Sequence, residues 1–181
     1  FFTSIIVWLL PPFKQFKGRY FLFFLILAFM DPIHFLSLLI IKSALPSQIT
    51  ILFNYCLLLS ILERNFIKKN WIWIFAITLV LFIPTILHFN RDKIILVYIL
   101  LQLGITLIVL KNLITNFISA GKLSLFHVVF LFYQFTIIVK FSNFLIGFAD
   151  ATAFFILTTI AQIIFGLFFS IVREDGAGIA H

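Results

Sequence analysis

The chain has 181 residues, of which 64% are apolar and only 10% are charged. Globular proteins that fold in water average about 45–50% apolar and about 25% charged residues, so this composition excludes a water-soluble fold. The 13 lysines and arginines outnumber the 6 acidic residues, but they cluster between apolar runs. The positive-inside bias of membrane proteins explains that pattern without a nucleic-acid partner.

The apolar runs predict a single helical membrane domain over residues 1–181. Lipid offers backbone groups no hydrogen-bond partner, so spanning segments are helices or closed barrels. The runs are apolar on all faces and do not alternate as barrel strands do, which favours an all-α bundle. At about 20 apolar residues per span, we expect about seven spans, six complete and one truncated. They cover residues 1–10 (partial), 20–42, 48–62, 71–89, 94–110, 123–145 and 151–172.

The first run, FFTSIIVWLL, ends at Pro11-Pro12, where a helix cannot continue. Because this run covers only about half of a bilayer core, we expect it to be the end of a span whose beginning is missing. The chain starts at Phe1 and its only methionine is Met30. The numbering is therefore expected to start within a longer polypeptide.

The distribution of basic residues predicts the orientation. Seven spans place nine of the 13 lysines and arginines on one side of the membrane, and the more basic side is expected to face the cytoplasm. This predicts an outside N-terminus and an inside C-terminus. The bias towards Phe, Ile, Lys and Asn is typical of an AT-rich genome and favours a bacterial inner membrane, with an organellar inner membrane as the alternative. The nine are Lys14, Lys17, Arg19, Arg64, Lys68, Lys69, Lys111, Lys122 and Arg173, and the others are Lys42, Arg91, Lys93 and Lys140.

Asp31 lies near the middle of the second expected span. A carboxylate at that depth costs on the order of 3 kcal/mol on insertion scales and usually faces a polar partner or water. Since Pro32 follows it, the pair predicts a broken span. In one hypothesis Asp31 caps the half-helix that begins at Pro32. In the other the break opens a polar pocket where Asp31 and His34, three residues apart on one face, bind a proton, a cation or a basic group.

The histidines argue against haem, which needs two facing histidines at one depth. By helix rise, His34 lies about 12 Å below the outer surface, whereas His88 is at that surface and His127 is near the inner one. We therefore expect no cofactor, and we interpret His88 and His127 as interfacial residues with a hydrated polar tip.

Lys140 follows a long apolar stretch in the sixth span. We expect its side chain to extend to the outer interface, and we include Lys140 with Asp31 and His34 in the candidate intramembrane polar site. If the helix continued to Ala149, Lys140 would lie deeper and would need an acidic partner such as Asp31, Asp92 or Asp150. Isolated polar residues in other spans are interpreted as interhelix hydrogen bonds, and they include Asn54, Gln102 and Gln134.

Small and polar residues gather around the start of the last span. Small side chains let helices approach closely, and Thr and Gln side chains bond across helices. We interpret this group as a packing seam, within the chain or against another subunit. Its members are Gly147, Ala149, Ala151, Ala153, Thr158 and Gln162.

The sequence contains no GxxxxGK[ST], HExxH, GxSxG or CxxC motif, so P-loop, zincin, serine-hydrolase and thiol-redox chemistry have no support. With no catalytic motif and no long loops, the chain is predicted to be a non-enzymatic accessory, scaffold or signal-relay subunit of a larger membrane complex. Its expected partners are the lipid bilayer and other membrane subunits. The alternative is a small transporter or channel with a polar site at Asp31, Pro32 and His34.

Overall fold

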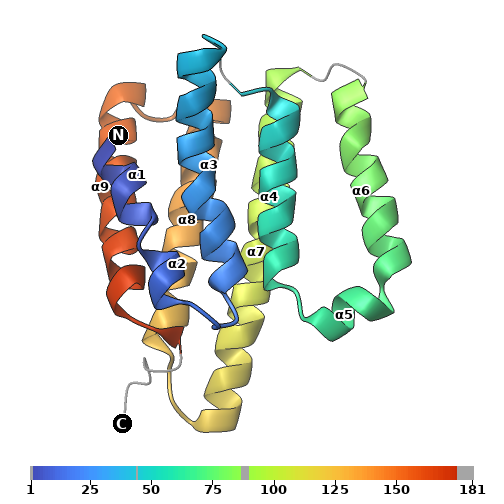
Figure 1. Ribbon diagram of the computed structural model, residues 1–181, viewed down its shortest axis with the longest axis vertical. Coiled ribbons are helices and arrows are strands. Elements are labelled where there is room, and N and C mark those ends of the chain that lie inside the picture. Colours follow the sequence, from blue (N-terminus) through green and yellow to red (C-terminus); the bar gives the residue numbers. More distant parts are fainter. Residues whose placement is uncertain (1, 44, 87–89, 175–181) are drawn as a thin grey trace.

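The computed structural model describes residues 2–43, 45–86 and 90–174, and within these ranges the chain is all-helical, without a β-strand (Figure 1). The expected all-α class is confirmed. The described helices are α1 (Phe2–Trp8), α2 (Pro11–Lys14), α3 (Phe21–Ile40), α4 (Ser47–Ile61), α5 (Arg64–Lys69), α6 (Trp71–Ile86), α7 (Arg91–Ala120), α8 (Leu125–Ile146) and α9 (Ala151–Ile171).

Four of these helices are long and apolar enough to cross a membrane, namely α3, α7, α8 and residues Thr152–Ile171 of α9. Each has at least 20 residues, which at about 1.5 Å per residue matches a hydrocarbon core of about 30 Å. This marks the chain as an integral membrane protein. Three further apolar stretches are shorter, and they cover Phe2–Lys14, Gln48–Ile61 and Trp71–Val80.

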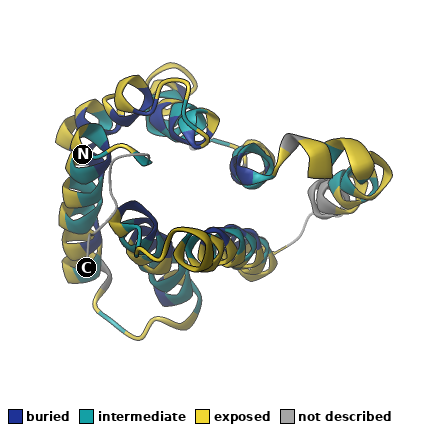
Figure 2. Ribbon diagram, turned by 90° about the horizontal axis from the view of Figure 1, so that it is seen from below, coloured by how far each residue is buried: buried dark blue, intermediate teal, exposed yellow. Residues whose placement is uncertain are grey.

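The helices run roughly along one axis and surround a common centre. Contacts between neighbours close a ring in the order α3, α4, α7, α8, α9 and α1, with α1 returning to α3. Helix α6 lies to one side of this ring and makes its main contacts with α4 and α5 (Figure 1, Figure 2). The short helix α2 packs against α3 and α9 at one end.

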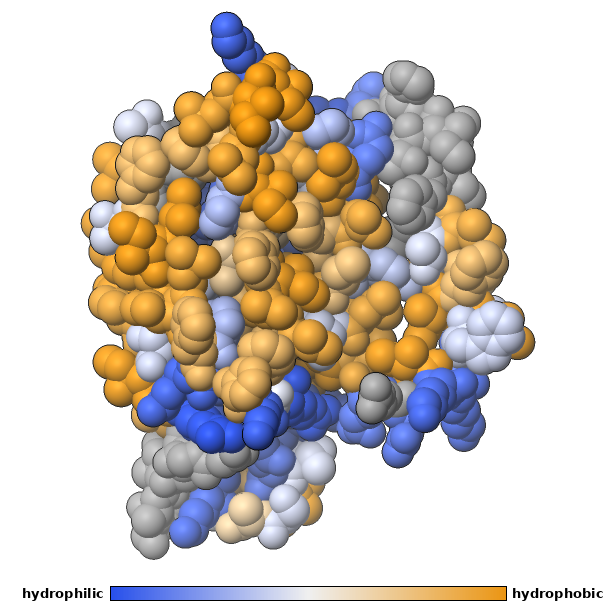
Figure 3. All heavy atoms as spheres, in the orientation of Figure 1, coloured by the Kyte–Doolittle hydropathy of each residue, from blue (hydrophilic) through white to orange (hydrophobic). Residues whose placement is uncertain are grey.

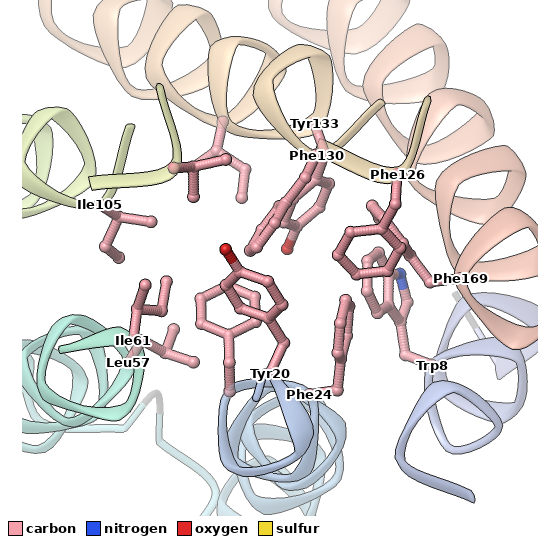
Figure 4. Close-up of a cluster of buried hydrophobic side chains, with 13 residues drawn as sticks. Trp8, Tyr20, Phe24, Leu57, Ile61, Ile105, Phe126, Phe130, Tyr133 and Phe169 are labelled. Atoms are coloured by element: carbon pink, nitrogen blue, oxygen red, sulfur yellow. The ribbon is translucent and has the colours of Figure 1, made fainter. Parts of the chain in front are cut away.

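A cluster of aromatic side chains fills the centre of the helix ring near the end where α3 begins. Phe24, Phe126, Phe130 and Phe169 are fully buried and come from α3, α8 and α9. Their rings point toward one another (Figure 4), with centroids 4.9 Å apart for Phe24 and Phe169 and 5.3 Å apart for Phe126 and Phe169. Such pairs contribute about 0.5–1.5 kcal/mol beyond the area that they bury. This cluster therefore holds three of the four long helices together.

Polar side chains gather at the same end of the molecule. Figure 3 shows a hydrophilic band at the lower end, where Figure 1 places α2, the start of α3, α5 and the end of α9. Within the band Arg19 pairs with Glu63 at 3.5 Å, and Lys111 lines a small hollow beside both. The apolar surface above this band is the part that suits lipid.

The expected break at Pro32 is wrong. Helix α3 continues through Pro32 to Ile40, so Asp31 does not cap a half-helix. Pro32 has no N–H for the carbonyl of Ala28, and its ring crowds that carbonyl. A full break in lipid would leave several more backbone groups without partners. A continuous helix that lacks one hydrogen bond therefore has a lower free energy than a broken one.

The fifth expected span, 94–110, is also too short. Helix α7 runs from Arg91 to Ala120 and ends at Gly121, which has a left-handed φ of 64°. Lysine is a good helix former, so Lys111 ends the apolar run without ending the helix. At about 1.5 Å per residue, 30 residues exceed the bilayer core, and the last turns of α7 extend beyond the ends of α3 and α4 (Figure 1).

A close helix approach lies at Gly166, where α1 packs on α9. A Cβ atom added to Gly166 would lie 2.7 Å from Val7 Cγ1 and 3.4 Å from Trp8 Cε2. Both neighbours are constrained, because β-branched Val7 has few rotamers and Trp8 is a buried part of the core.

Gly166→Ala is therefore expected to destabilise the fold by about 1–3 kcal/mol, the usual cost of overpacking. Thermal unfolding in detergent measures this loss. The matched control is Ile160→Phe, an enlargement of a side chain that is 51% exposed on the same helix. Equal stability of the two variants would show that α1 does not dock tightly on α9.

Candidate functional site

A cavity of about 350 Å³ lies inside the ring, between α3, α4, α7, α8 and α9. Its volume is at the lower end of the range of about 300–1,000 Å³ that is typical of small-molecule sites. Its polar lining consists of Asp31, His34, Asn54, Gln102, Tyr133, Gln134, Lys140 and Gln162. Most of these residues lie well inside helices that are long enough to cross a membrane, so the cavity belongs to the membrane-embedded part.

Helix α3 contributes Asp31 and His34 from one face, as their spacing of three residues predicts. The pocket hypothesis placed these two side chains together, and the structure does so without a helix break. Asp31 and His34 form no ion pair within 4.0 Å of each other among the described residues. The pocket forms because α4, α7 and α8 stand around this face of α3.

Lys140 lines the same cavity instead of extending to the interface. Helix α8 continues past Lys140 to Ile146, which places the ammonium group below the helix end. Its Nζ atom lies 5.3 Å from the centre of the Phe155 ring on α9, a cation–π distance. Of the acidic partners considered from the sequence, Asp31 is the one that faces Lys140 across the cavity.

Two glutamines that line the cavity carry buried amide atoms without a partner among the described residues. Gln102 Nε2 donates to Asn54 Oδ1 at 2.8 Å, which confirms an interhelix hydrogen bond between α7 and α4, but Gln102 Oε1 has no partner among the described residues. Gln134 is fully buried, and neither its Oε1 nor its Nε2 has a partner in the described part of the chain. The interpretation of Gln134 as an interhelix bond is wrong, because no polar side chain of a described neighbouring helix reaches it.

An unpaired buried amide is unusual enough to need an explanation. Leaving such a group without a partner costs about 1–3 kcal/mol, and buried polar groups normally find protein or water partners. The rest of the cavity wall is apolar and aromatic, with Trp8, Phe23, Leu27, Phe141 and Phe155 among its members. A mostly apolar wall with a few converging polar groups is typical of ligand sites.

A second polar cluster, below the aromatic core, forms a chain of hydrogen bonds. Asn112 Nδ2 donates to the Tyr20 hydroxyl at 2.9 Å, and the same hydroxyl is hydrogen-bonded to His127 Nε2 at 3.1 Å. His127 Nδ1 is hydrogen-bonded to Ser124 Oγ at 2.8 Å. His127 is fully buried, and the expectation of a hydrated tip is wrong because Tyr20 and Ser124 replace water as its partners.

Tyr20→Phe is expected to cost about 1–3 kcal/mol of folding free energy, since it removes the hydrogen bonds of the Tyr20 hydroxyl to the buried Asn112 amide and to His127 Nε2. The other polar neighbour of His127 Nε2, Glu174 Oε1, is 3.9 Å away. Denaturant unfolding in detergent micelles measures the change. Tyr133→Phe is the matched control, because the Tyr133 hydroxyl makes no hydrogen bond within the described ranges. A Tyr20→Phe variant as stable as this control would contradict the hydrogen-bond chain.

The group of small residues near α9 forms a turn within this chain. Gly147 ends α8 with a φ of 68°, and a Cβ atom added there would meet nothing within 4 Å among the described residues. The Ala149 N–H donates to Asn143 Oδ1 at 2.9 Å, and Asp150 accepts from the Ala153 N–H at 2.8 Å. A seam at these residues and at Ala151 against another subunit stays a prediction.

The rest of the predicted seam lies farther along α9. Thr158 donates to the Phe154 carbonyl of its own helix at 2.9 Å and not across helices, whereas Gln162 lines the cavity. The close helix approach expected here occurs at Gly166, two turns beyond Thr158. In a sequence, a lone glycine in an apolar helix indicates a close helix contact less strongly than a cluster of small residues does.

Of the three histidines in the expected spans, His88 lies outside the described residues. His34 lines the cavity, and His127 belongs to the hydrogen-bonded cluster near the other end of α8. Comparison with known proteins gives no match to a family model, to a curated protein or to a solved structure.

Proposed function

We propose that the chain is a non-enzymatic membrane protein that binds a small polar solute in its internal cavity and acts as a small transporter or channel. The observation that carries this proposal is Gln134, whose buried amide has no partner among the described residues and lies in the wall of a cavity that Asp31 and Lys140 also line. The proposal requires no cofactor and no nucleic acid.

The energetic argument separates this role from a purely structural one. Each charge at this depth costs on the order of 3 kcal/mol on insertion scales, and each unpaired amide costs about 1–3 kcal/mol. A helix bundle that served only as a scaffold would be more stable with apolar residues at these positions. Water or a polar ligand in the cavity offsets these costs, which supports a binding role.

The function we propose includes the topology expected from the sequence. Helices α1 with α2, α4 and α6 run alongside the four long helices (Figure 1), which supports seven passes if α1 and α2 are counted as the first. Helix α4 has 15 residues and requires local thinning of the bilayer. Helices α2 and α5 carry basic residues in their last turns and lie at the end with the hydrophilic band (Figure 1, Figure 3). This supports an inside C-terminus, and the membrane we propose is a bacterial inner membrane.

A second candidate, the subunit of a larger membrane complex, is favoured by α6. This helix lies beside the ring, and Tyr55 fastens it to α4 through bonds to the Ile74 carbonyl at 3.0 Å and to Thr78 Oγ1 at 2.8 Å. Trp71 and Trp73 are 63% and 71% exposed. Stoichiometric partners that co-purify in mild detergent and are lost when α6 is deleted would support this role.

Uptake of labelled amines, carboxylic acids and amino acids into proteoliposomes tests the leading proposal. We expect at least one of these classes to enter above the level of protein-free liposomes, and Gln134→Leu to reduce that uptake about tenfold or more, since it removes both amide contacts. Thr136→Val is the control, because the Thr136 hydroxyl bonds to its own helix at the Phe132 carbonyl. No uptake of any class, or equal uptake by Gln134→Leu and wild type, would contradict the proposal.

A further inference from the structure

The cavity contains two opposite charges that interact without touching. Asp31 on α3 and Lys140 on α8 line the same cavity, but no ion pair within 4.0 Å joins them in the part of the chain that is described. Lys140 instead rests over the Phe155 ring. In a low-dielectric site, opposite charges gain from direct contact, so their separation leaves room for a group between them.

We infer that the cavity binds a small zwitterion, an inference that rests on the proposed function, with the ammonium group of the ligand at Asp31 and its anionic group at Lys140. A ligand with a single charge would compensate either Asp31 or Lys140 and leave the other residue with an uncompensated charge, which is costly in a buried site. A zwitterion compensates the charges of both residues and adds no net charge to the membrane interior.

The unpaired amides fit the same ligand. Within the described part of the chain, Gln134 Oε1, Gln134 Nε2 and Gln102 Oε1 have no hydrogen-bond partner, and both glutamines line the cavity. Turned toward a ligand in the cavity, the two oxygens would accept from its ammonium group and the nitrogen would donate to its anionic oxygen. The apolar wall formed by Trp8, Phe23 and Leu27 suits an aliphatic portion. This chemistry is shared by an apolar α-amino acid and by the ethanolamine phosphate headgroup of a lipid.

Trp8 provides a local readout, since it lines the cavity. The sequence has three tryptophans, and replacement of the exposed Trp71 and Trp73 by Phe leaves Trp8 as the only one. The full chain in detergent is titrated with four probes and the fluorescence is recorded. L-Leucine carries both charges, isoamylamine lacks the carboxylate, isocaproate lacks the ammonium group, and glycerophosphoethanolamine represents the lipid headgroup.

We expect L-leucine or glycerophosphoethanolamine to bind about tenfold or more tightly than isoamylamine and isocaproate, the difference expected from one charge-assisted contact. Tighter binding of L-leucine would identify the ligand as an amino acid, and tighter binding of glycerophosphoethanolamine would identify it as a lipid headgroup. Lys140→Gln should lower leucine affinity to that of isoamylamine, and Asp31→Asn should lower it to that of isocaproate. Thr136→Val should leave all four affinities unchanged.

The outcomes separate this inference from the proposed function. Isoamylamine or isocaproate binding as tightly as L-leucine would overturn the zwitterion and leave a site for a single charge, with the proposed function intact. If no probe changes Trp8 fluorescence while the proteoliposomes still take up a solute, the zwitterion alone is wrong. If neither assay responds, both proposals are wrong.

Discussion

Asp31→Asn should reduce solute uptake by about ten- to a hundredfold, because a hydrogen bond to a charged group contributes about 1.5–3 kcal/mol and about 1.4 kcal/mol corresponds to a factor of ten. The substitution keeps the shape of the side chain and removes the negative charge that faces the cavity. Initial uptake rates into proteoliposomes measure the effect. The substrate is whichever solute class the wild-type protein transports.

The matched control is Asp92→Asn, which removes a carboxylate that is exposed in the first turn of α7 and lies outside the cavity lining. This variant should transport at the wild-type rate. Equal losses in both variants would indicate a general effect of negative charge and would remove Asp31 from the site.

Asp31 and Lys140 should also depend on each other for stability. Asp31→Asn leaves the Lys140 ammonium without an opposite charge, and Lys140→Gln leaves the Asp31 carboxylate in the same position. Each single variant is expected to lose about 1–3 kcal/mol. The double variant should recover about 1–2 kcal/mol relative to the sum of the two, as groups that share one electrostatic environment do.

The wild-type protein, the two single variants and the double variant form a double-mutant cycle. Their free energies of unfolding in detergent, without added solute, give the coupling energy between Asp31 and Lys140. A parallel cycle of Asp92→Asn with Lys140→Gln serves as the reference, since Asp92 does not line the cavity. Strict additivity in the Asp31 cycle would show that the two charges contribute to folding independently, and it would argue against a shared cavity.

Composition and apolar periodicity were sufficient to predict an all-α membrane fold, because lipid allows few backbone structures. They also identified Asp31, His34 and Lys140, since a charge within an apolar run is visible without any tertiary information. They grouped the three as one candidate intramembrane polar site, but they placed the end of the Lys140 side chain at the outer interface and not in a cavity. The shared cavity depends on how α3 and α8 are rotated in the ring, which side-chain packing decides.

Other features depended on energetic balances and tertiary contacts that a sequence pattern does not show. Pro32 indicated a break, but the cost of exposing backbone groups in lipid favours a continuous α3. The structural role of His127 depends on Tyr20, which is 107 residues away in the chain. The unpaired amide of Gln134 was equally unpredictable, because its neighbours on other helices decide whether a glutamine has a partner.

Access of water to Gln134 tests the central claim most directly. In a Cys56→Ser background, which removes the one native cysteine, Gln134→Cys is treated with the membrane-impermeant reagent 2-(trimethylammonium)ethyl methanethiosulfonate. Val109→Cys is the control, since Val109 is as fully buried as Gln134 but does not line the cavity. A polar, hydrated site predicts rapid labelling at position 134 and none at 109. Failure of both positions to react would show that the cavity is a dry part of the core and would contradict a binding role.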